Sequence, residues 1–330
     1  MRTGSIPSSL SMTSQPLPHD NPGGTMNSPA AVAYPTRKGE AQMTYRQEPA
    51  VWSDLDGPPL GPLSIDQLRQ YEREGYLVFP GLLDAGLVRT LNNELVHATR
   101  EAGRATNPRF VLGNSDGDVR RIHDIHVNRP EFGELAASEP LAGAARQVLD
   151  SDVYLHLARA SILPGTFGEG YPWHSDFEGW HARDGMPSMR CVGISVLLSP
   201  TGEHSGAMLL SPGSHRTFIS AFSAPDAQSP PGWEGRHEPD LIGIEAVLDG
   251  SGIERIEGPP GTVVLFDSNL LHATLPNLAP DAVASLFFAY NSIENKLRDP
   301  RSGNEPRPEW FAHREATEPL PAMETAARSR

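Results

Sequence analysis

The stretch Tyr171-Pro-Trp-His-Ser-Asp-Phe-Glu-Gly-Trp-His181 decides the fold prediction, because its centre, His174-Ser-Asp176, is a pattern suited to holding a metal ion. Aromatic residues precede the pattern and a run rich in Val, Ile and Leu follows it, which predicts an extended segment. In an extended segment, the side chains of residues i and i+2 point to the same side. We therefore expect the His174 imidazole and the Asp176 carboxylate to lie side by side.

A second imidazole would complete the two-histidine, one-carboxylate face of a non-haem Fe(II) site, which leaves coordination positions open for small molecules. The candidate is His272. A turn at Pro259-Pro-Gly261 leads into a β-branched and aromatic run, and His272 is expected at the far end of that strand. The alternatives are a structural hydrogen-bonded pair for His174 and Asp176, and a core histidine for His272. A Ser-His-Asp hydrolase triad is excluded, because adjacent side chains of a strand diverge.

Composition limits the classes of function. The chain has 330 residues, of which 38% are hydrophobic, and its 31 Gly and 32 Pro favour many turns over long helices. A net charge of −14 disfavours nucleic acid or an anionic membrane as partner, since both attract clustered Lys and Arg. The single cysteine, Cys191, cannot form an internal disulfide, and no apolar run approaches the roughly 18 residues of a membrane span. We expect a cytoplasmic protein that binds a small molecule and assembles as a homodimer.

The chain divides into three parts. Residues 1–50 are polar and rich in Pro, Ser and Gly, which predicts a disordered tail, and 321–330 form a second tail. Residues 51–320 form one domain, in which helices precede short strands separated by Pro and Gly turns. This order predicts a mainly β fold with flanking helices and a jelly-roll core at about 105–295. Residues 222–240 are expected to form a loop or lid over the site.

Several motifs together resemble those of the ectoine-hydroxylase group in the phytanoyl-CoA-hydroxylase-like family. They are Trp173–His181, Asp184-Gly-Met-Pro-Ser-Met-Arg190, Ser211–Thr217, Phe266-Asp-Ser-Asn269 and Pro306-Arg-Pro-Glu-Trp310. The resemblance extends over about residues 51–320 and implies a double-stranded β-helix, the cupin-like form of the jelly roll. It also implies an Fe(II)- and 2-oxoglutarate-dependent dioxygenase that uses O2 to hydroxylate a C–H bond of a small amino-acid-like or zwitterionic metabolite, releasing succinate and CO2.

The resemblance implies three groups of site residues. The iron ligands are His174, Asp176 and His272, the co-substrate residues are Ser195, Arg159 and Trp173, and the substrate residues are Trp180, Arg307 and Phe177. For Trp180 the alternative is core packing, and for Arg307 it is an ion pair with a surface carboxylate.

One departure from the family pattern concerns the co-substrate. About eleven residues after the second histidine, the family has an arginine that pairs with the distal carboxylate of 2-oxoglutarate, and this chain has Val283. A buried carboxylate without a cation carries a large desolvation penalty, so we expect Arg159 or Arg190 to substitute. The alternative is an iron oxygenase or oxidase of the same fold that acts on another natural-product intermediate without 2-oxoglutarate.

A second departure concerns the substrate. The ectoine-type pattern Gln-Ser-Arg-x-Asn-x-Lys is replaced by Leu157-Ala-Arg-Ala-Ser-Ile-Leu163, which keeps only Arg159. Loss of hydrogen-bonding groups changes substrate discrimination by orders of magnitude, so the change predicts a substrate less polar than ectoine. A further alternative is a binding protein that keeps the fold but has another metal or no activity.

Overall fold

The computed structural model describes residues 34–35, 42–102, 107–113, 117–166, 168–220, 241–301, 303 and 305–321. Loop 222–240, most of the N-terminal tail and nearly all of the C-terminal tail lie outside these residues. No described helix combines the length and apolar character needed to cross a membrane.

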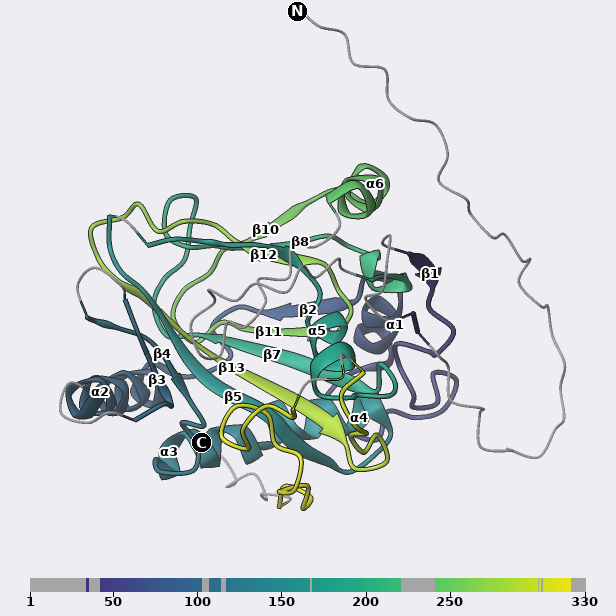
Figure 1. The fold of residues 1–330 in the computed structure, drawn as a ribbon, viewed down its shortest axis with the longest axis horizontal. Helices are drawn as coiled ribbons and strands as arrows, with labels where there is room; N and C mark the ends of the chain where they lie inside the picture. Colours follow the sequence, from purple (N-terminus) through teal and green to yellow (C-terminus); the bar gives the residue numbers. More distant parts are fainter. Residues whose placement is uncertain are drawn as a thin grey trace, which may run out of the picture.

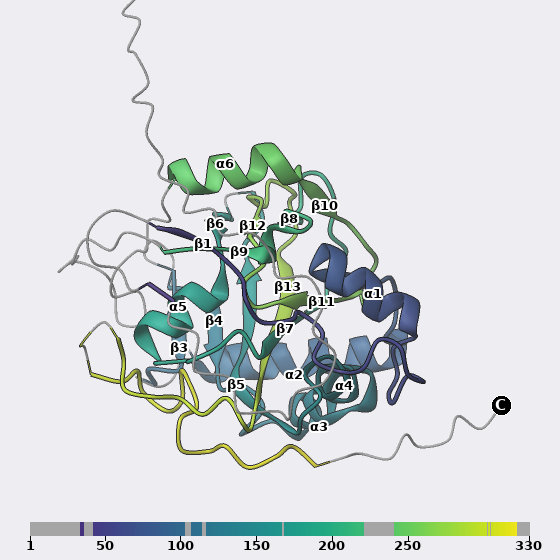
Figure 2. The same ribbon diagram turned by 90° about the vertical axis from the view of Figure 1, so that its right-hand side faces the viewer.

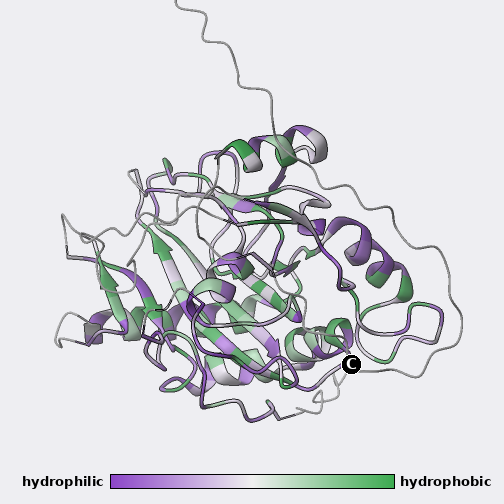
Figure 3. Ribbon diagram, turned by 45° about the vertical axis from the view of Figure 1, so that its right-hand side comes forward, coloured by the Kyte–Doolittle hydropathy of each residue, from purple (hydrophilic) through white to green (hydrophobic). Residues whose placement is uncertain are grey.

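The largest layer is a seven-stranded antiparallel sheet (Figure 1). Its strands, in spatial order, are β2 (Tyr76–Phe79), β11 (Val263–Asp267), β7 (Cys191–Leu197), β13 (Val283–Ser292), β5 (Val153–Leu163), β4 (Val119–His123) and β3 (Phe110–Leu112). The sequence also predicts β5, because the apolar run from Val153 to Leu163 ends at Pro164-Gly165, and the structure confirms this strand. Hydrophobic residues recur along these strands (Figure 3), and apolar clusters cover both faces of the sheet.

Helices cover the outer face of the large sheet. They are α1 (Ile65–Glu74), α2 (Ala85–Ala102), α3 (Pro130–Ala137), a π-helical turn η1 (Glu139–Gly143) and α4 (Ala144–Leu149). The stretch Ser64-Ile-Asp-Gln67 predicts a capping box at the start of α1, and the structure confirms it. The Ser64 side chain accepts from the Gln67 amide, and the Gln67 side chain accepts from the Ser64 amide. The buried apolar residues of these helices form the main core together with the residues on the outer face of the large sheet.

A four-stranded sheet faces the inner side of the large one. It contains β10 (Glu254–Ile256), β8 (Met208–Leu210), β12 (His272–Thr274) and β6 (Tyr171–His174). Helix α6 (Leu241–Ser251) lies over it at one end of the layers, and α2, α3 and α4 lie at the other (Figures 1 and 2). A second apolar cluster fills the space between the sheets, next to helix α5 (Asp176–Arg183). This arrangement is the mainly β jelly roll with helical support that the sequence predicts.

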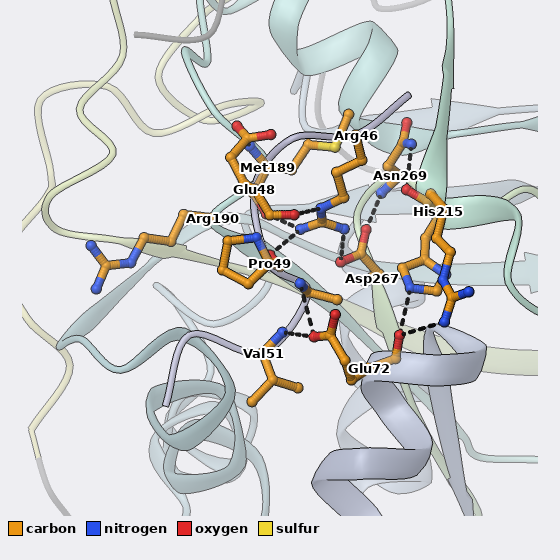
Figure 4. A network of polar contacts seen from close by, with 12 residues as sticks. Arg46, Glu48, Pro49, Val51, Glu72, Met189, Arg190, His215, Asp267 and Asn269 are labelled. Carbon is orange, nitrogen blue, oxygen red and sulfur yellow. Dashed lines mark hydrogen bonds and ion pairs between the residues drawn. The ribbon is translucent and has the colours of Figure 1, made fainter. Parts of the chain in front are cut away.

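The predicted tail is wrong for Tyr34, which is buried in the inner apolar cluster, and for residues 42–50, which are also part of the fold. Strand β1 (Met43–Tyr45) pairs with β9 (Thr217–Ile219), which follows the short 3-10 turn η2 (Ser214–Arg216). Next to β1, Arg46 forms an ion pair with Asp267 at 2.6 Å (Figure 4). The sequence could not indicate this contact, because its two partners are 221 positions apart.

Candidate metal centre

Two histidines face each other across neighbouring strands. His174 ends β6 and His272 begins β12, and the two residues are direct partners in the antiparallel ladder. Their ring centroids are 4.1 Å apart. The prediction that these imidazoles converge is supported, but the expected position of His272 is wrong. It does not end the strand that starts after Gly261, because β11 stops at Asp267 and a turn separates the two strands.

Asp176 reaches the same point by a different route from the one predicted. The chain leaves the extended conformation at Ser175, whose hydroxyl accepts a hydrogen bond from the Glu178 amide and caps helix α5. Asp176 is therefore the first residue of a helix and not the next strand position. Its Oδ1 lies 3.7 Å from His174 Nε2, and its Oδ2 lies 3.7 Å from His272 Nε2.

These three side chains are arranged to hold a divalent cation. Each histidine donates its Nδ1–H to a backbone carbonyl at 2.9 Å, His174 to Pro172 and His272 to Leu270. Such bonds fix the ring and leave the Nε2 lone pair for a metal. Burial and the neighbouring His272 lower the pKa of His174 well below its ordinary value, so the ring is neutral. Asp176 Oδ2 is buried with no hydrogen-bond partner among the described residues, as expected of a metal ligand.

A second group, Asp124, His126 and His313, also has converging donor atoms. Its carboxylate is already occupied, because Asp124 accepts from His313 Nε2 at 3.0 Å and from the Arg109 guanidinium at 3.2 Å. A cation placed there would be repelled by Arg109. The first group is therefore the better candidate for an iron site, and the second holds the C-terminal segment against the end of β4.

Comparison with known proteins agrees with this geometry. The phytanoyl-CoA dioxygenase (PhyH) family matches residues 71–282. The chain belongs to the phytanoyl-CoA dioxygenase family. Ectoine dioxygenase of Bordetella bronchiseptica is 37% identical over 310 residues, which cover 92% of this chain and 100% of that protein.

Solved structures of the ectoine dioxygenase EctD from S. alaskensis show the same fold. The structure with 2-oxoglutarate and 5-hydroxyectoine superposes with a TM-score of 0.79 at 33% identity, covering 88% of this chain and 97% of EctD. The structure with bound Fe gives a TM-score of 0.77, also at 33% identity, and covers 87% and 96% of the two chains. Our chain is thus an Fe(II)- and 2-oxoglutarate-dependent dioxygenase, and the predicted double-stranded β-helix and the predicted use of Fe(II), 2-oxoglutarate and O2 are confirmed.

An aromatic wall adjoins the metal centre of this family member. Trp180 lies one helical turn after Asp176, so both project from the same side of α5. The Trp180 ring stacks against Phe287 at 6.5 Å, Phe287 stacks against Phe266 at 5.8 Å, and Phe266 lies 5.0 Å from the His272 ring. Trp180 is therefore well placed for the predicted role in substrate binding.

Phe177 and Trp173 lie away from this wall. Phe177 is fully buried and packs against Tyr34 at 5.4 Å, His181 at 5.3 Å and Phe218 at 5.8 Å, on another side of α5. Trp173 packs with the apolar cluster under helix α6. The predicted substrate contact by Phe177 and co-substrate contact by Trp173 are replaced by packing, because neighbouring residues of a helix or strand point in different directions.

The two arginines of the motifs 184–190 and 306–310 are both in ion pairs. Arg190 pairs with Glu294, donates to the Leu149 and Asp150 carbonyls, and lies over Trp52. The suggestion that Arg190 anchors the co-substrate is therefore wrong.

Arg307 donates through Nε and Nη2 to both oxygens of Asp184, a buried carboxylate. Asp184 also accepts from His156 Nε2 at 3.0 Å, and His156 contacts the Trp180 ring edge-on at 5.3 Å. Arg307 and His156 hold the pKa of Asp184 well below its ordinary value. This link between Arg307 and the wall was not predicted, because no sequence pattern indicates His156 or Asp184 as partners.

Arg159 and Ser195 both lie on the inner face of the large sheet. Phe287 of β13 pairs with Arg159 of β5 on one side and with Ser195 of β7 on the other, so the three side chains form one row. The Arg159 guanidinium lies 4.9 Å from the Phe287 ring centroid. His123 of β4 extends the row beyond Arg159. The predicted co-substrate residues Arg159 and Ser195 thus face the same interior as the aromatic wall.

Proposed function

We propose that this enzyme hydroxylates a small zwitterion, ectoine or a less polar relative of it. The observation that carries the proposal is that Trp180 and Arg307 are linked through His156 and Asp184 beside the metal centre. A zwitterion needs an aromatic face for its cationic part and a guanidinium for its carboxylate. The relatives named ectoine dioxygenase, with nearly full coverage of both chains, support the same class of substrate.

The side chains have separate roles in this proposal. Hydroxylation of a C–H bond, with release of succinate and CO2, is the chemistry that Fe(II), 2-oxoglutarate and O2 supply when bound. His174, His272 and Asp176 would hold the metal ion, and as three protein ligands they would leave coordination positions for small molecules. Trp180 and Phe287 exclude water from that side and hold the reacting carbon in a fixed position. Asp184 fixes the Arg307 guanidinium through Nε and Nη2, so that Nη1 can serve a substrate carboxylate.

The inner face is less polar than the ectoine-type pattern. Leu157 is the partner of Ala289 in the ladder and lies in the inner apolar cluster, where the pattern has a glutamine. A polar group of ectoine that this glutamine would bind meets a hydrocarbon side chain here. We therefore propose that analogues with fewer hydrogen-bonding groups are turned over better than ectoine.

The test is turnover with purified enzyme, Fe(II), 2-oxoglutarate and O2, using ectoine and a series of cyclic and linear amino-acid-derived zwitterions. The expected result is a product with one additional oxygen atom, formed in the same amount as succinate. His174→Ala is the inactive control. The proposed substrate class would be wrong if every zwitterion led to succinate without an oxygenated product. It would also be wrong if no zwitterion raised succinate formation above the rate measured without substrate.

The remaining predictions about the whole protein are also proposals. They are a single oxygenase domain, a homodimer, a cytoplasmic location and the absence of nucleic-acid and membrane partners. The net charge of −14 supports only the last of these. Light scattering after size-exclusion chromatography would measure the assembly.

A further inference from the structure

The position where the family has its co-substrate arginine carries an apolar side chain in this chain, and so does its partner on the neighbouring strand. Val283 on β13 is the ladder partner of Leu163 on β5. The family pattern described above has an arginine at the first position and a lysine at the second. The structure therefore shows that two separate departures in sequence are one pair in space. A carboxylate beside this pair would meet two hydrocarbon side chains and would have no cation to offset its desolvation.

Positive charge lies on the same face, one and two rows further along the sheet. Ser161 and Ser285 form the next row, and Arg121 of β4 is the partner of Ser161. Arg159 follows in the third row beside His123. Because residues two apart on a strand share a face, Val283, Arg121 and Arg159 all point to the interior between the sheets.

Two buried nitrogens in the third row have no hydrogen-bond partner among the described residues. They are Arg159 Nε and His123 Nδ1. None of the ion pairs between described residues involves Arg159, although the chain has an excess of carboxylates. A buried Nε of a guanidinium without an acceptor is costly, so this row is suited to a ligand that brings a negative charge.

The electrostatics of the neighbouring groups agree. Burial and the charges of Arg159, Arg121 and Arg307 lower the pKa of His123 to about 3, so the ring is neutral. Burial and the charge of Arg159 lower the pKa of Arg121 to about 10. Arg121 lies 5.6 Å from the Tyr171 ring, and Tyr171 lies 4.5 Å from the His174 ring.

We propose that Arg159, with Arg121 and His123 beside it, binds the distal carboxylate of 2-oxoglutarate in place of the family arginine. The binding position for this carboxylate thereby shifts along the same face of the sheet, from the row that contains Leu163 and Val283 to the rows that contain Arg121, Arg159 and His123. This inference rests on the dioxygenase activity assigned above, and it is independent of which zwitterion is hydroxylated.

The test compares two keto acids in anaerobic titrations of the Fe(II)-loaded protein, followed by the visible charge-transfer absorption of a bound keto acid. 2-Oxoglutarate carries the distal carboxylate, and 2-oxobutyrate lacks it. The wild-type protein is expected to bind 2-oxoglutarate more tightly. Arg159→Gln and Arg121→Gln should each weaken 2-oxoglutarate by roughly 10- to 150-fold, the range for a hydrogen bond to a charged group, and should leave 2-oxobutyrate unchanged.

Matched variants separate this role from a structural one. Arg120→Gln removes the same charge from the next residue of β4, which points to the opposite face, and should change neither dissociation constant. Leu163→Lys combined with Val283→Arg restores the family pair and should recover 2-oxoglutarate binding in the Arg159→Gln background.

The readout is the dissociation constant of 2-oxobutyrate divided by that of 2-oxoglutarate. If Arg159→Gln and Arg121→Gln kept the wild-type value of this ratio, the proposed binding position would be refuted. The same conclusion would follow if Arg120→Gln lowered the ratio as much as the other two substitutions. A wild-type protein that bound iron but gave no absorption with either keto acid would contradict the dioxygenase assignment itself, which is a distinct result.

Discussion

Replacing Arg46 by Met is expected to destabilise the fold and to weaken the iron site together. Arg46 and Asp267 are buried, with side chains only 4% and 1% exposed, and their atoms approach to 2.6 Å. Removing one partner of a buried ion pair costs about 3–5 kcal/mol, because the other charge stays buried without compensation. Arg46 also donates to the carbonyls of Glu48 and Pro49, and these bonds are lost as well.

The effect should reach the metal centre through the turn before β12. Asp267 accepts a hydrogen bond from the Asn269 amide at 2.8 Å, and Asn269 donates to the His215 carbonyl at 2.9 Å (Figure 4). This turn sets the start of the strand that carries His272. We therefore expect the Arg46→Met protein to bind Fe(II) more weakly in addition to unfolding more easily.

Urea unfolding gives the free energy, and an Fe(II) titration gives the affinity. Arg73→Met is the matched control, since Arg73 is 63% exposed and pairs with Glu74 at the surface, where a substitution changes stability by only about 0.5 kcal/mol. Arg46→Met with Asp267→Asn removes both charges and should recover part of the loss. If Arg46→Met lowered the free energy of unfolding by less than about 1 kcal/mol, the reasoning would be refuted, because a buried carboxylate without a partner destabilises the fold by more than that.

Three further outcomes are expected. His174→Ala should abolish Fe(II) binding and turnover while urea unfolding of the metal-free protein changes little, and retained iron binding in a titration would contradict the ligand assignment. Leu157→Gln should raise the ratio of kcat/KM for ectoine to that for a less polar analogue, at a stability cost of about 1–3 kcal/mol for the buried amide, and an unchanged ratio would show that residue 157 does not contact substrate. The free energy of unfolding should decrease as the pH drops below about 6.5. Burial lowers the pKa of His123 to about 3 and of His126 and His215 to about 4, so the unfolded chain takes up these protons first as the pH falls. Each histidine then contributes a loss of about 1.4 kcal/mol per pH unit between the unfolded and folded pKa values. Urea unfolding at pH 7, 6 and 5 measures the slope, which His215→Gln should reduce and which a flat profile would contradict.

Local patterns were enough to predict much of the fold. The capping box at Ser64 and the long strand at 153–163 follow from residues close together in the chain. The motifs also predict that His174, Asp176 and His272 converge, but Asp176 reaches the site as the first residue of a helix and not as the next strand position. The signal for the correct interpretation was present, because Ser175-Asp-Phe-Glu178 has the spacing of a helix N-cap motif and should have ended the predicted strand.

Contacts between distant segments were not predictable. Residues 42–50 have a tail-like composition, and they are ordered by β9 and Asp267, which lie far along the chain. The alternation in 119–127 predicts a strand, of which the structure forms 119–123, but it does not predict which face of the strand points inward. The register with β5 is needed to place Arg121 beside the arginine that the resemblance had indicated, Arg159.

The facing pair Leu163–Val283 bears on how enzymes of this kind are recognised in genomes. A profile that scores the arginine after the second iron histidine as a single obligatory position would reject this chain as inactive. Since residues 163 and 283 are partners in the β-ladder, the two positions should be scored together, either as a pair of cationic residues or as a pair of apolar residues. Chains with the apolar state and arginines at the positions of 121 and 159 would then form a recognisable subgroup of the family.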